Sequence, residues 1–134
     1  MLFRSGKVQQ LLTHYNKPYT GSRSLASALS MNKEHAKHSL RGTEILMPDH
    51  FVIEDSPDIE QKMREAYNSF APKCVVKPIS AGSSVGVSIA ENYQGFTDAV
   101  HRALATSLQA LVEEYIEGRE ATCGVVQGMR GERI

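Results

Sequence analysis

A strand–loop–strand segment in the second half of the chain constrains the fold more than any other feature. Residues 73–77 (KCVVK) form a β-rich run that Pro78 closes, and residues 86–89 (GVSI) form a second one. Between them lies a loop of small residues, from Ser80 to Ser84. Short β-rich runs bounded by turn residues are typical of paired strands, so this segment predicts a small antiparallel sheet.

Helical periodicity dominates the first half. Apolar residues at i, i+3, i+4 and i+7 give residues 7–16 one apolar helix face. A second, short helix is expected around residues 25–29. A third is expected from Lys33 to about Leu40, with Asn32 as its N-cap.

Further helices and strands follow in alternation. Ser56 and Pro57 are typical of an N-cap and a first helical position, and the apolar residues of 96–104 share one helix face. The chain begins with helices and continues with strands and helices mixed, an order that indicates an α+β or α/β fold. The additional strands are predicted at 51–53, at 111–116 and, after a tight turn at 117–119, at 120–127, with one more hairpin turn at 128–131.

The composition excludes several classes of protein. The 134 residues fit one domain, and 41% of them are apolar. Lys+Arg and Asp+Glu balance at 15 each, so no overall field attracts nucleic acid or an anionic membrane. No apolar run approaches the ~20 residues that span a bilayer, and the start of the chain is not typical of a signal peptide. Cys74 and Cys123 are therefore interpreted as reduced core thiols of a cytoplasmic protein.

The small-residue loop is the strongest candidate for chemistry. Small side chains allow backbone N–H groups to converge on an anion, and Lys77 adds a positive charge just before the loop. The segment has neither the GxxxxGK[ST] pattern of a P-loop nor the GxGxxG pattern of a dinucleotide site. The alternative interpretation is an ordinary β-hairpin with a flexible glycine loop.

Two other groups of residues carry weaker signals. On a strand, Glu113 and Tyr115 share one face, and a hairpin would bring Glu120 near them. The alternative is a charged, solvated hairpin. Lys33 begins its predicted helix and Lys37 follows one turn later, where solvated surface lysines are the alternative. The histidines at 35 and 38 lack partners at metal-ligand spacing, so no metal site is predicted from the residues themselves.

Taken together, these residues resemble the D-alanine–D-alanine ligases of the ATP-grasp superfamily. The resemblance covers nearly the whole chain, and the combination of its motifs is highly specific. It rests on QQLL leading to PYTGS (9–12 and 18–22), ASALSMNK (26–33), VVKP…GSSVGV (75–87) and VEEYIEGRE (112–120).

The resemblance implies an α+β fold with a role for each matched residue. The fold would be an ATP-grasp central subdomain of helices and a small antiparallel sheet, with the first strands of the C-terminal subdomain. Lys33 and Lys77 would contact ATP phosphates, under a loop closing from Ser80 to Gly86. Ser83 would also act as the catalytic residue that positions the first D-alanine. Glu113 and the backbone of Tyr115 and Ile116 would hold the adenine, and Glu120 the ribose hydroxyls. The ATP-binding residues that the resemblance implies are therefore Lys33, Lys77, Ser80, Gly82, Ser83, Ser84, Glu113, Tyr115, Ile116 and Glu120.

The implied activity is an ATP-dependent ligation. One D-alanine carboxylate is phosphorylated to an acyl phosphate, which the amine of a second D-alanine attacks, with lysines and Mg²⁺ neutralising charge. Such a ligase serves peptidoglycan precursor synthesis, and thus cell wall biogenesis and cell shape, in the cytoplasm. Its partners would be ATP and D-alanine, without nucleic acid or membrane, and its full-length parent would be a homodimer.

The chain also departs from the family pattern. Residues 1–21 are expected to end an N-terminal substrate domain that is otherwise missing, 22–112 to form the central subdomain, and 113–134 to begin a truncated C-terminal subdomain. The Mg²⁺ ligands are expected downstream, so the isolated chain is expected to be inactive. Two alternatives stay open: another ATP-grasp carboxylate–amine ligase, and a non-catalytic nucleotide-binding module.

Overall fold

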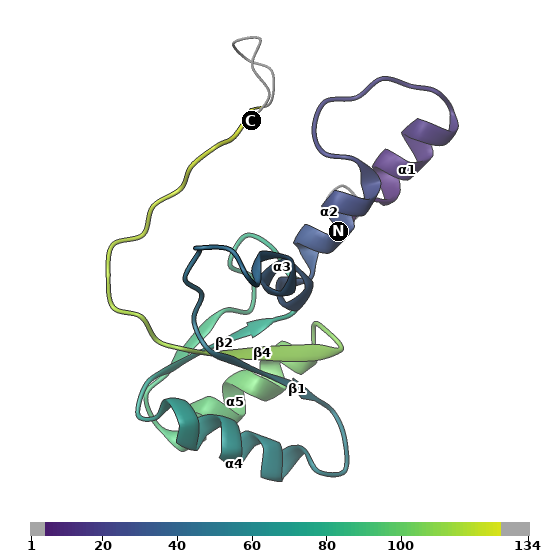
Figure 1. Ribbon diagram of the computed structural model, residues 1–134. Coiled ribbons are helices and arrows are strands. Elements are labelled where there is room, and N and C mark those ends of the chain that lie inside the picture. The colour runs from purple at the N-terminus through teal and green to yellow at the C-terminus, as the bar shows by residue number, and fades with distance from the viewer. Residues whose placement is uncertain (1–4, 127–134) are drawn as a thin grey trace.

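A four-stranded antiparallel sheet forms the centre of the structure, a computed structural model that describes residues 5–126 (Figure 1). The strands lie in the order β1-β4-β2-β3, and every neighbouring pair is antiparallel. The small antiparallel sheet of an α+β fold is therefore confirmed. Its strands are β1 (His50–Glu54), β2 (Cys74–Pro78), β3 (Ser88–Ala90) and β4 (Gln109–Glu114).

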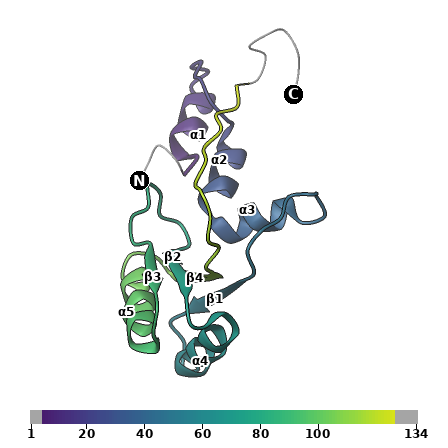
Figure 2. The ribbon, with the colours of Figure 1, turned by 90° about the vertical axis from the view of Figure 1, so that its left-hand side faces the viewer.

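Two helices cover one face of this sheet and a third lies over the other face (Figure 2). Helices α4 (Ile59–Phe70) and α5 (Tyr93–Leu104) pack on the first face, and α3 (Lys33–Leu40) lies on the second. The Asn92 side chain caps α5 by accepting a hydrogen bond from Gly95 N at 2.8 Å. The buried core between α4, α5 and the sheet comprises Ile53, Met63, Ala66, Cys74, Val76, Ala90, Phe96, Ala99, Val100, Ala103, Ala110 and Val112.

The alternation of side chains along β2 and β4 decides which residues face α3. Cys74 and Val76 lie in the core on the α5 side, and Ala110 and Val112 do so on β4. Because successive side chains of a strand point to opposite faces, the residues between them point the other way. The second face therefore presents Val75 and Lys77 from β2, and Leu111 and Glu113 from β4.

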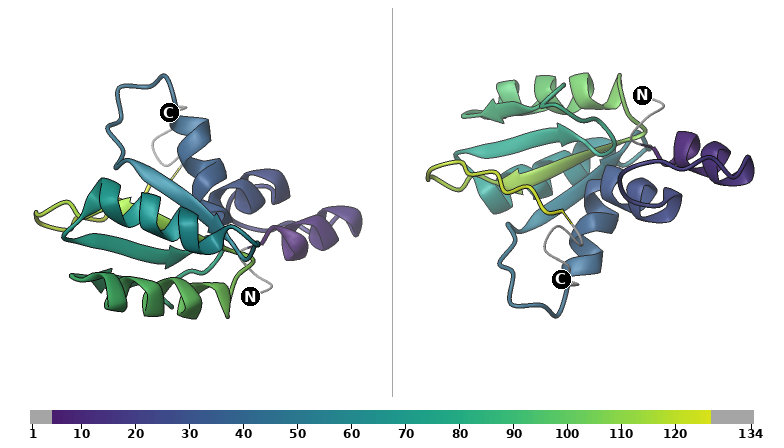
Figure 3. Two further views of the ribbon diagram at one scale, coloured as in Figure 1. Left: turned by 90° about the horizontal axis from the view of Figure 1, so that it is seen from below. Right: turned by 90° about the horizontal axis from the view of Figure 1, so that it is seen from above.

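Helices α1 (Lys7–His14) and α2 (Ser24–Met31) extend away from the sheet (Figures 1 and 3). Neither helix contains a fully buried residue. They approach each other closely at Gly6, whose φ is +79°, and a Cβ there would lie 2.2 Å from Ser24 O. No helix within residues 5–126 has the length and apolar character needed to cross a bilayer.

Two predicted elements begin later in the chain than expected. Helix α4 begins at Ile59 with Asp58 as its N-cap, because Ser56 and Pro57 belong to a turn in which Ser56 Oγ donates to Asp58 Oδ1 at 2.6 Å. Strand β3 begins two residues later than expected, since Gly86 has a φ of +74° that an extended strand does not adopt.

The predicted hairpin after residue 114 is not formed. β4 ends at Glu114, and residues 120–126 are exposed and pair with no described strand. A two-stranded hairpin is marginal by itself, and Val125 is 73% exposed because no sheet face covers it. The prediction that Cys123 is a core thiol is wrong for the same reason, whereas Cys74 is buried and free as expected. Residue 127 and the turn at 128–131 lie outside the described residues.

Candidate nucleotide-binding site

Lys77 and Glu113 meet on the sheet face that α3 covers. In the register of β2 with β4, Lys77 pairs with Leu111 and Val75 pairs with Glu113. Diagonal neighbours on one face of an antiparallel pair are within reach of long side chains. The Lys77 ammonium accordingly forms an ion pair with Glu113 Oε2.

Helix α3 brings two further lysines to the same face. Its N-cap Asn32 accepts a hydrogen bond from His35 N at 3.0 Å, and the first helical residue is Lys33. The Lys33 ammonium donates to Pro78 O at 2.8 Å and to Ala81 O at 2.6 Å, so it ties the helix to the small-residue loop. Lys37 lies one turn further along α3 and points at the sheet.

Among residues 5–126, Glu113 is the one polar or charged residue that is buried, with an exposed fraction of 3%. Its Oε1 accepts from Lys37 Nζ at 2.7 Å, while Oε2 binds Lys77. Burial by itself raises the pKa of the Glu113 carboxyl, but the hydrogen bonds and charges of the two lysines outweigh burial and hold this pKa below its ordinary value. For Lys33, burial and the nearby charge of Lys77 lower the pKa, against the attraction of Glu113.

These ion pairs predict a specific loss of stability in acid. The folded-state pKa of Glu113 lies below its ordinary value of 4.5, so its stabilising contribution is present above pH 4.5 and is lost as the pH falls through the lowered pKa. We expect the free energy of unfolding of the wild-type chain to fall more steeply between about pH 5 and pH 3 than that of Glu113→Gln. Urea titrations at several pH values measure this difference.

Glu114→Gln is the matched control for this prediction. Glu114 is the exposed neighbour of Glu113, and its Oε1 accepts from the backbone N–H of Asp49 at 3.0 Å rather than from a lysine. The control variant should keep the steep wild-type dependence. Parallel pH profiles for wild type and Glu113→Gln would contradict the assignment of the acid-sensitive group.

The loop after β2 turns sharply through three residues with positive φ. Ser83 and Ser84 have φ values of 56° and 57°, in the left-handed region. Gly86 also has positive φ, and a Cβ there would lie 2.6 Å from Pro78 Cγ, so the loop folds back against the end of β2. Backbone N–H groups in such turns converge toward a concave side, which is the geometry of an anion-binding nest.

Most of the sequence-predicted site residues line one cleft of about 570 Å³. Lysines 33 and 77 lie in it with the loop, and Val75, Val87 and Ile89 form an apolar wall. Ser80 is exposed and is not among the lining residues. The predicted residues that the cleft does bring together are Lys33, Lys77, Gly82, Ser83, Ser84, Glu113, Tyr115, Ile116 and Glu120. Glu120 reaches it without the expected hairpin.

Two further lysines lie near this cleft. Lys37, which the sequence placed one helical turn after Lys33 with a solvated surface lysine as the alternative, has a side chain that is only 12% exposed and is paired with Glu113. The sequence does not indicate the second lysine, Lys73. Lys73 stacks over the Tyr115 ring, with Nζ 4.0 Å from the centroid, and holds this ring beside the cleft. Nothing in the local sequence indicates that contact.

The cleft has a charge pattern suited to an anion but not to a divalent metal. Both oxygens of its buried carboxylate, Glu113, are occupied by lysines. Within residues 5–126, no group of three or more His, Cys, Asp or Glu side chains could hold a metal ion. The cleft therefore combines a cationic end formed by Lys33 and Lys77, a loop of small residues and an apolar wall, which together suit a ligand with a phosphate group and a flat apolar part.

Comparisons with known proteins agree with this chemistry. The profile of the family described as D-ala D-ala ligase C-terminus matches residues 40–133. A D-alanine–D-alanine ligase of Aquifex aeolicus is 35% identical over 123 residues, which are 92% of this chain and 40% of that protein. The chain thus belongs to the D-alanine–D-alanine ligase family, and it spans about 40% of the length of this curated relative.

Solved structures show the same relationship. The D-alanine–D-alanine ligase of Coxiella burnetii superimposes with a TM-score of 0.79 at 28% identity, covering 89% of this chain and 36% of that one. The VanG D-Ala:D-Ser ligase of Enterococcus faecalis gives a TM-score of 0.77 at 27% identity, covering 86% and 33%. The fold of this chain is therefore that of one segment of these ligases.

Proposed function

We propose that this chain forms the nucleotide-binding part of an ATP-dependent D-alanine–D-alanine ligase that acts in peptidoglycan precursor synthesis. The observation that carries the proposal is the cleft in which Lys33, Lys77 and the loop around Ser83 meet at one end of an apolar wall. A triphosphate would lie at the cationic end, because charge-assisted hydrogen bonds to phosphate are the strongest contacts available there. ATP, when bound, supplies the phosphoryl group that activates a carboxylate.

Each residue of the cleft has a proposed task. Lys77 and Lys33 bind phosphate oxygens, and the amides of Gly82 and Ser84 add donors from the loop. Ser83 positions the first D-alanine. Glu113, beside Lys77, and the backbone of residues 115–116 hold adenine against Val87 and Ile89, and Glu120 binds the ribose hydroxyls.

Magnesium is part of the proposed activity but not of this cleft. The buried carboxylate of the cleft is already paired with lysines, so we assign no step through Mg²⁺ to the described residues. The Mg²⁺ ligands are expected downstream of the chain. The proposal also keeps the division into residues 1–21, 22–112 and 113–134, a homodimeric parent, and a cytoplasmic location, where ATP is available.

The similarity to VanG supports a second candidate. That protein is a D-Ala:D-Ser ligase, and its TM-score of 0.77 is close to that of the Coxiella burnetii enzyme. The nucleotide cleft alone does not distinguish acceptor amines. A ligase that joins D-alanine to another small amine is therefore the alternative, and a non-catalytic nucleotide-binding module is an outcome that the test below also detects.

Two measurements test the proposal. The first titrates a fluorescent ATP analogue into the 134-residue chain and competes it with ATP and with adenosine. The second couples ADP release to added D-alanine or D-serine, in this chain and in a longer protein that contains it. We expect tighter binding of ATP than of adenosine, D-alanine-dependent turnover in the longer protein, and none in the isolated chain.

The outcomes separate the candidates. Turnover that depends on D-serine as the second substrate would favour the alternative ligase. ATP binding with no amino-acid-dependent turnover in the longer protein would indicate a binding module. No preference for ATP over adenosine would refute the nucleotide site.

A further inference from the structure

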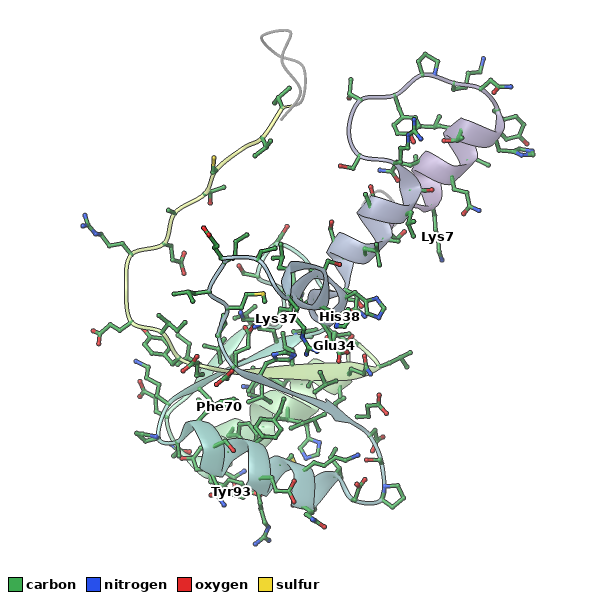
Figure 4. The ribbon with its side chains drawn as sticks, viewed as in Figure 1. Lys7, Glu34, Lys37, His38, Phe70 and Tyr93 are labelled. Atoms are coloured by element: carbon green, nitrogen blue, oxygen red, sulfur yellow. The ribbon has the colours of Figure 1, made fainter. Side chains whose placement is uncertain are left out.

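Lys37 lies outside the cleft but contacts Glu113, one of the residues that line it. It is not among the residues that line the cleft, and its ammonium donates to Glu113 Oε1 at 2.7 Å and to Pro48 O at 2.6 Å. Its side chain is 12% exposed. Figure 4 shows Lys37 on α3, on the side of the sheet away from α4 and α5. A lysine in this position acts on a ligand in the cleft through the two lining residues that it contacts, Glu113 and Pro48.

The arrangement creates a conflict for Lys77. In the described structure the Lys77 ammonium is paired with Glu113, whereas phosphate binding requires that ammonium to turn toward the cleft. A carboxylate that is 3% exposed cannot be left without a partner, because an unpaired buried charge is strongly destabilising. Without a second lysine, Glu113 would hold Lys77 and neutralise its charge.

We propose that Lys37 is a positioning residue that keeps Lys77 available to the phosphates of the nucleotide by holding Glu113 in its place. This inference rests on the proposed nucleotide function. Because Glu113 retains a charged partner on Oε1, Lys77 exchanges its own pairing for a phosphate oxygen without leaving a bare carboxylate. Glu113 and its two lysines also keep a net positive charge, which attracts an anion.

The simplest competing role for Lys37 is structural. Its hydrogen bond to Pro48 O ties α3 to the segment before β1, and losing that tie would disturb the cleft as a whole. The two roles predict different ligand dependence. A structural defect weakens binding of ATP and adenosine alike, whereas the exchange of partners concerns only the phosphates.

The experiment compares ATP with adenosine in charge variants of the chain. Lys37→Met removes the charge and keeps most of the side-chain volume, and Lys37→Arg restores the charge. Lys62→Met is the matched control, since it removes a lysine on α4, on the opposite face of the sheet, that pairs with Asp58. Binding is measured by competition with the fluorescent ATP analogue, and thermal unfolding of each variant reports its folding.

We expect Lys37→Met to weaken ATP binding by roughly 10-fold or more and adenosine binding by less than about twofold. Lys37→Arg should recover most of the ATP affinity, and Lys62→Met should match wild type. In a Glu113→Gln background the Lys37→Met effect on ATP should largely disappear, because no buried charge then competes for Lys77. A purely structural role of Lys37 would not make its effect on ATP binding depend on the charge of Glu113.

Three results would overturn the inference. They are equal losses for ATP and adenosine in Lys37→Met, an unchanged ATP affinity in that variant, and an undiminished effect in the Glu113→Gln background. If the single variant Lys37→Met fails to fold, the inference is tested with Lys37→Arg and by comparing Glu113→Gln with the double variant Glu113→Gln/Lys37→Met. An ATP affinity that falls in the double variant relative to Glu113→Gln would overturn the inference. A wild-type chain that does not prefer ATP would instead refute the proposed function, so the two failures are distinguishable.

Discussion

Replacing Lys77 by methionine is expected to lower the affinity of the chain for ATP by roughly 10- to 150-fold. Loss of a charge-assisted contact to a phosphate costs ~1.5–3 kcal/mol, which corresponds to that range. The position of Lys77 is set by the β2–β4 ladder. Competition titrations of ATP against the fluorescent analogue measure the loss.

Lys33→Met is the matched comparison and is expected to cost less. The Lys33 ammonium already donates to the carbonyls of Pro78 and Ala81, so it has fewer donors left for a phosphate. Burial and the charge of Lys77 also lower the pKa of Lys33, which disfavours its charged form. Equal losses in the two variants would contradict this order, and reversed losses would make Lys33 the principal phosphate ligand.

Phe96→Ala is expected to cost the chain about 3–5 kcal/mol of unfolding free energy. Phe96 is fully buried on α5, against the sheet, with its ring centroid 5.4 Å from that of Tyr67 and 6.1 Å from that of Tyr93. Its removal leaves a cavity in addition to the lost burial of apolar surface. Urea denaturation, compared at a common slope with wild type, measures the change.

Phe51→Ala is the control for this prediction. Phe51 lies on the edge strand β1, is 36% exposed and contacts the Phe70 ring at 5.5 Å, so the same truncation should cost clearly less. Because total stabilities of small domains are only ~5–15 kcal/mol, Phe96→Leu provides a milder variant if Phe96→Ala unfolds. Equal losses at the two positions would show that the core is not centred between α5 and the sheet.

Local sequence patterns determined most of the secondary structure. The predicted helix from Lys33 to Leu40 and its Asn32 cap match α3, since a cap and a short helix depend on neighbouring residues alone. The same is true of the helix face at 96–104 and of the β-rich run at 73–77, within a few residues at their ends. Periodicity and turn chemistry act over a few residues, so they can be recognised without the rest of the fold.

The sequence also identified most of the residues that meet in the cleft. Lys77 and the small-residue loop are contiguous, and their combination of charge and small side chains is chemically specific. Ser80 belongs to the same segment but lies outside the lining residues. A contiguous motif therefore indicates the chemical character of the cleft, while the turns of the loop decide which of its side chains line it.

Only the tertiary structure decided the pairings that set the charge of the site. The strand order β1-β4-β2-β3 places Glu113 beside Lys77, and the packing of α3 on that face then brings Lys37 to the same carboxylate. Likewise, residues 120–126 pair with no strand among residues 5–126, and Cys123 is exposed. Such contacts join elements that are distant in the chain, and burial and charge balance between them are not encoded in any local pattern.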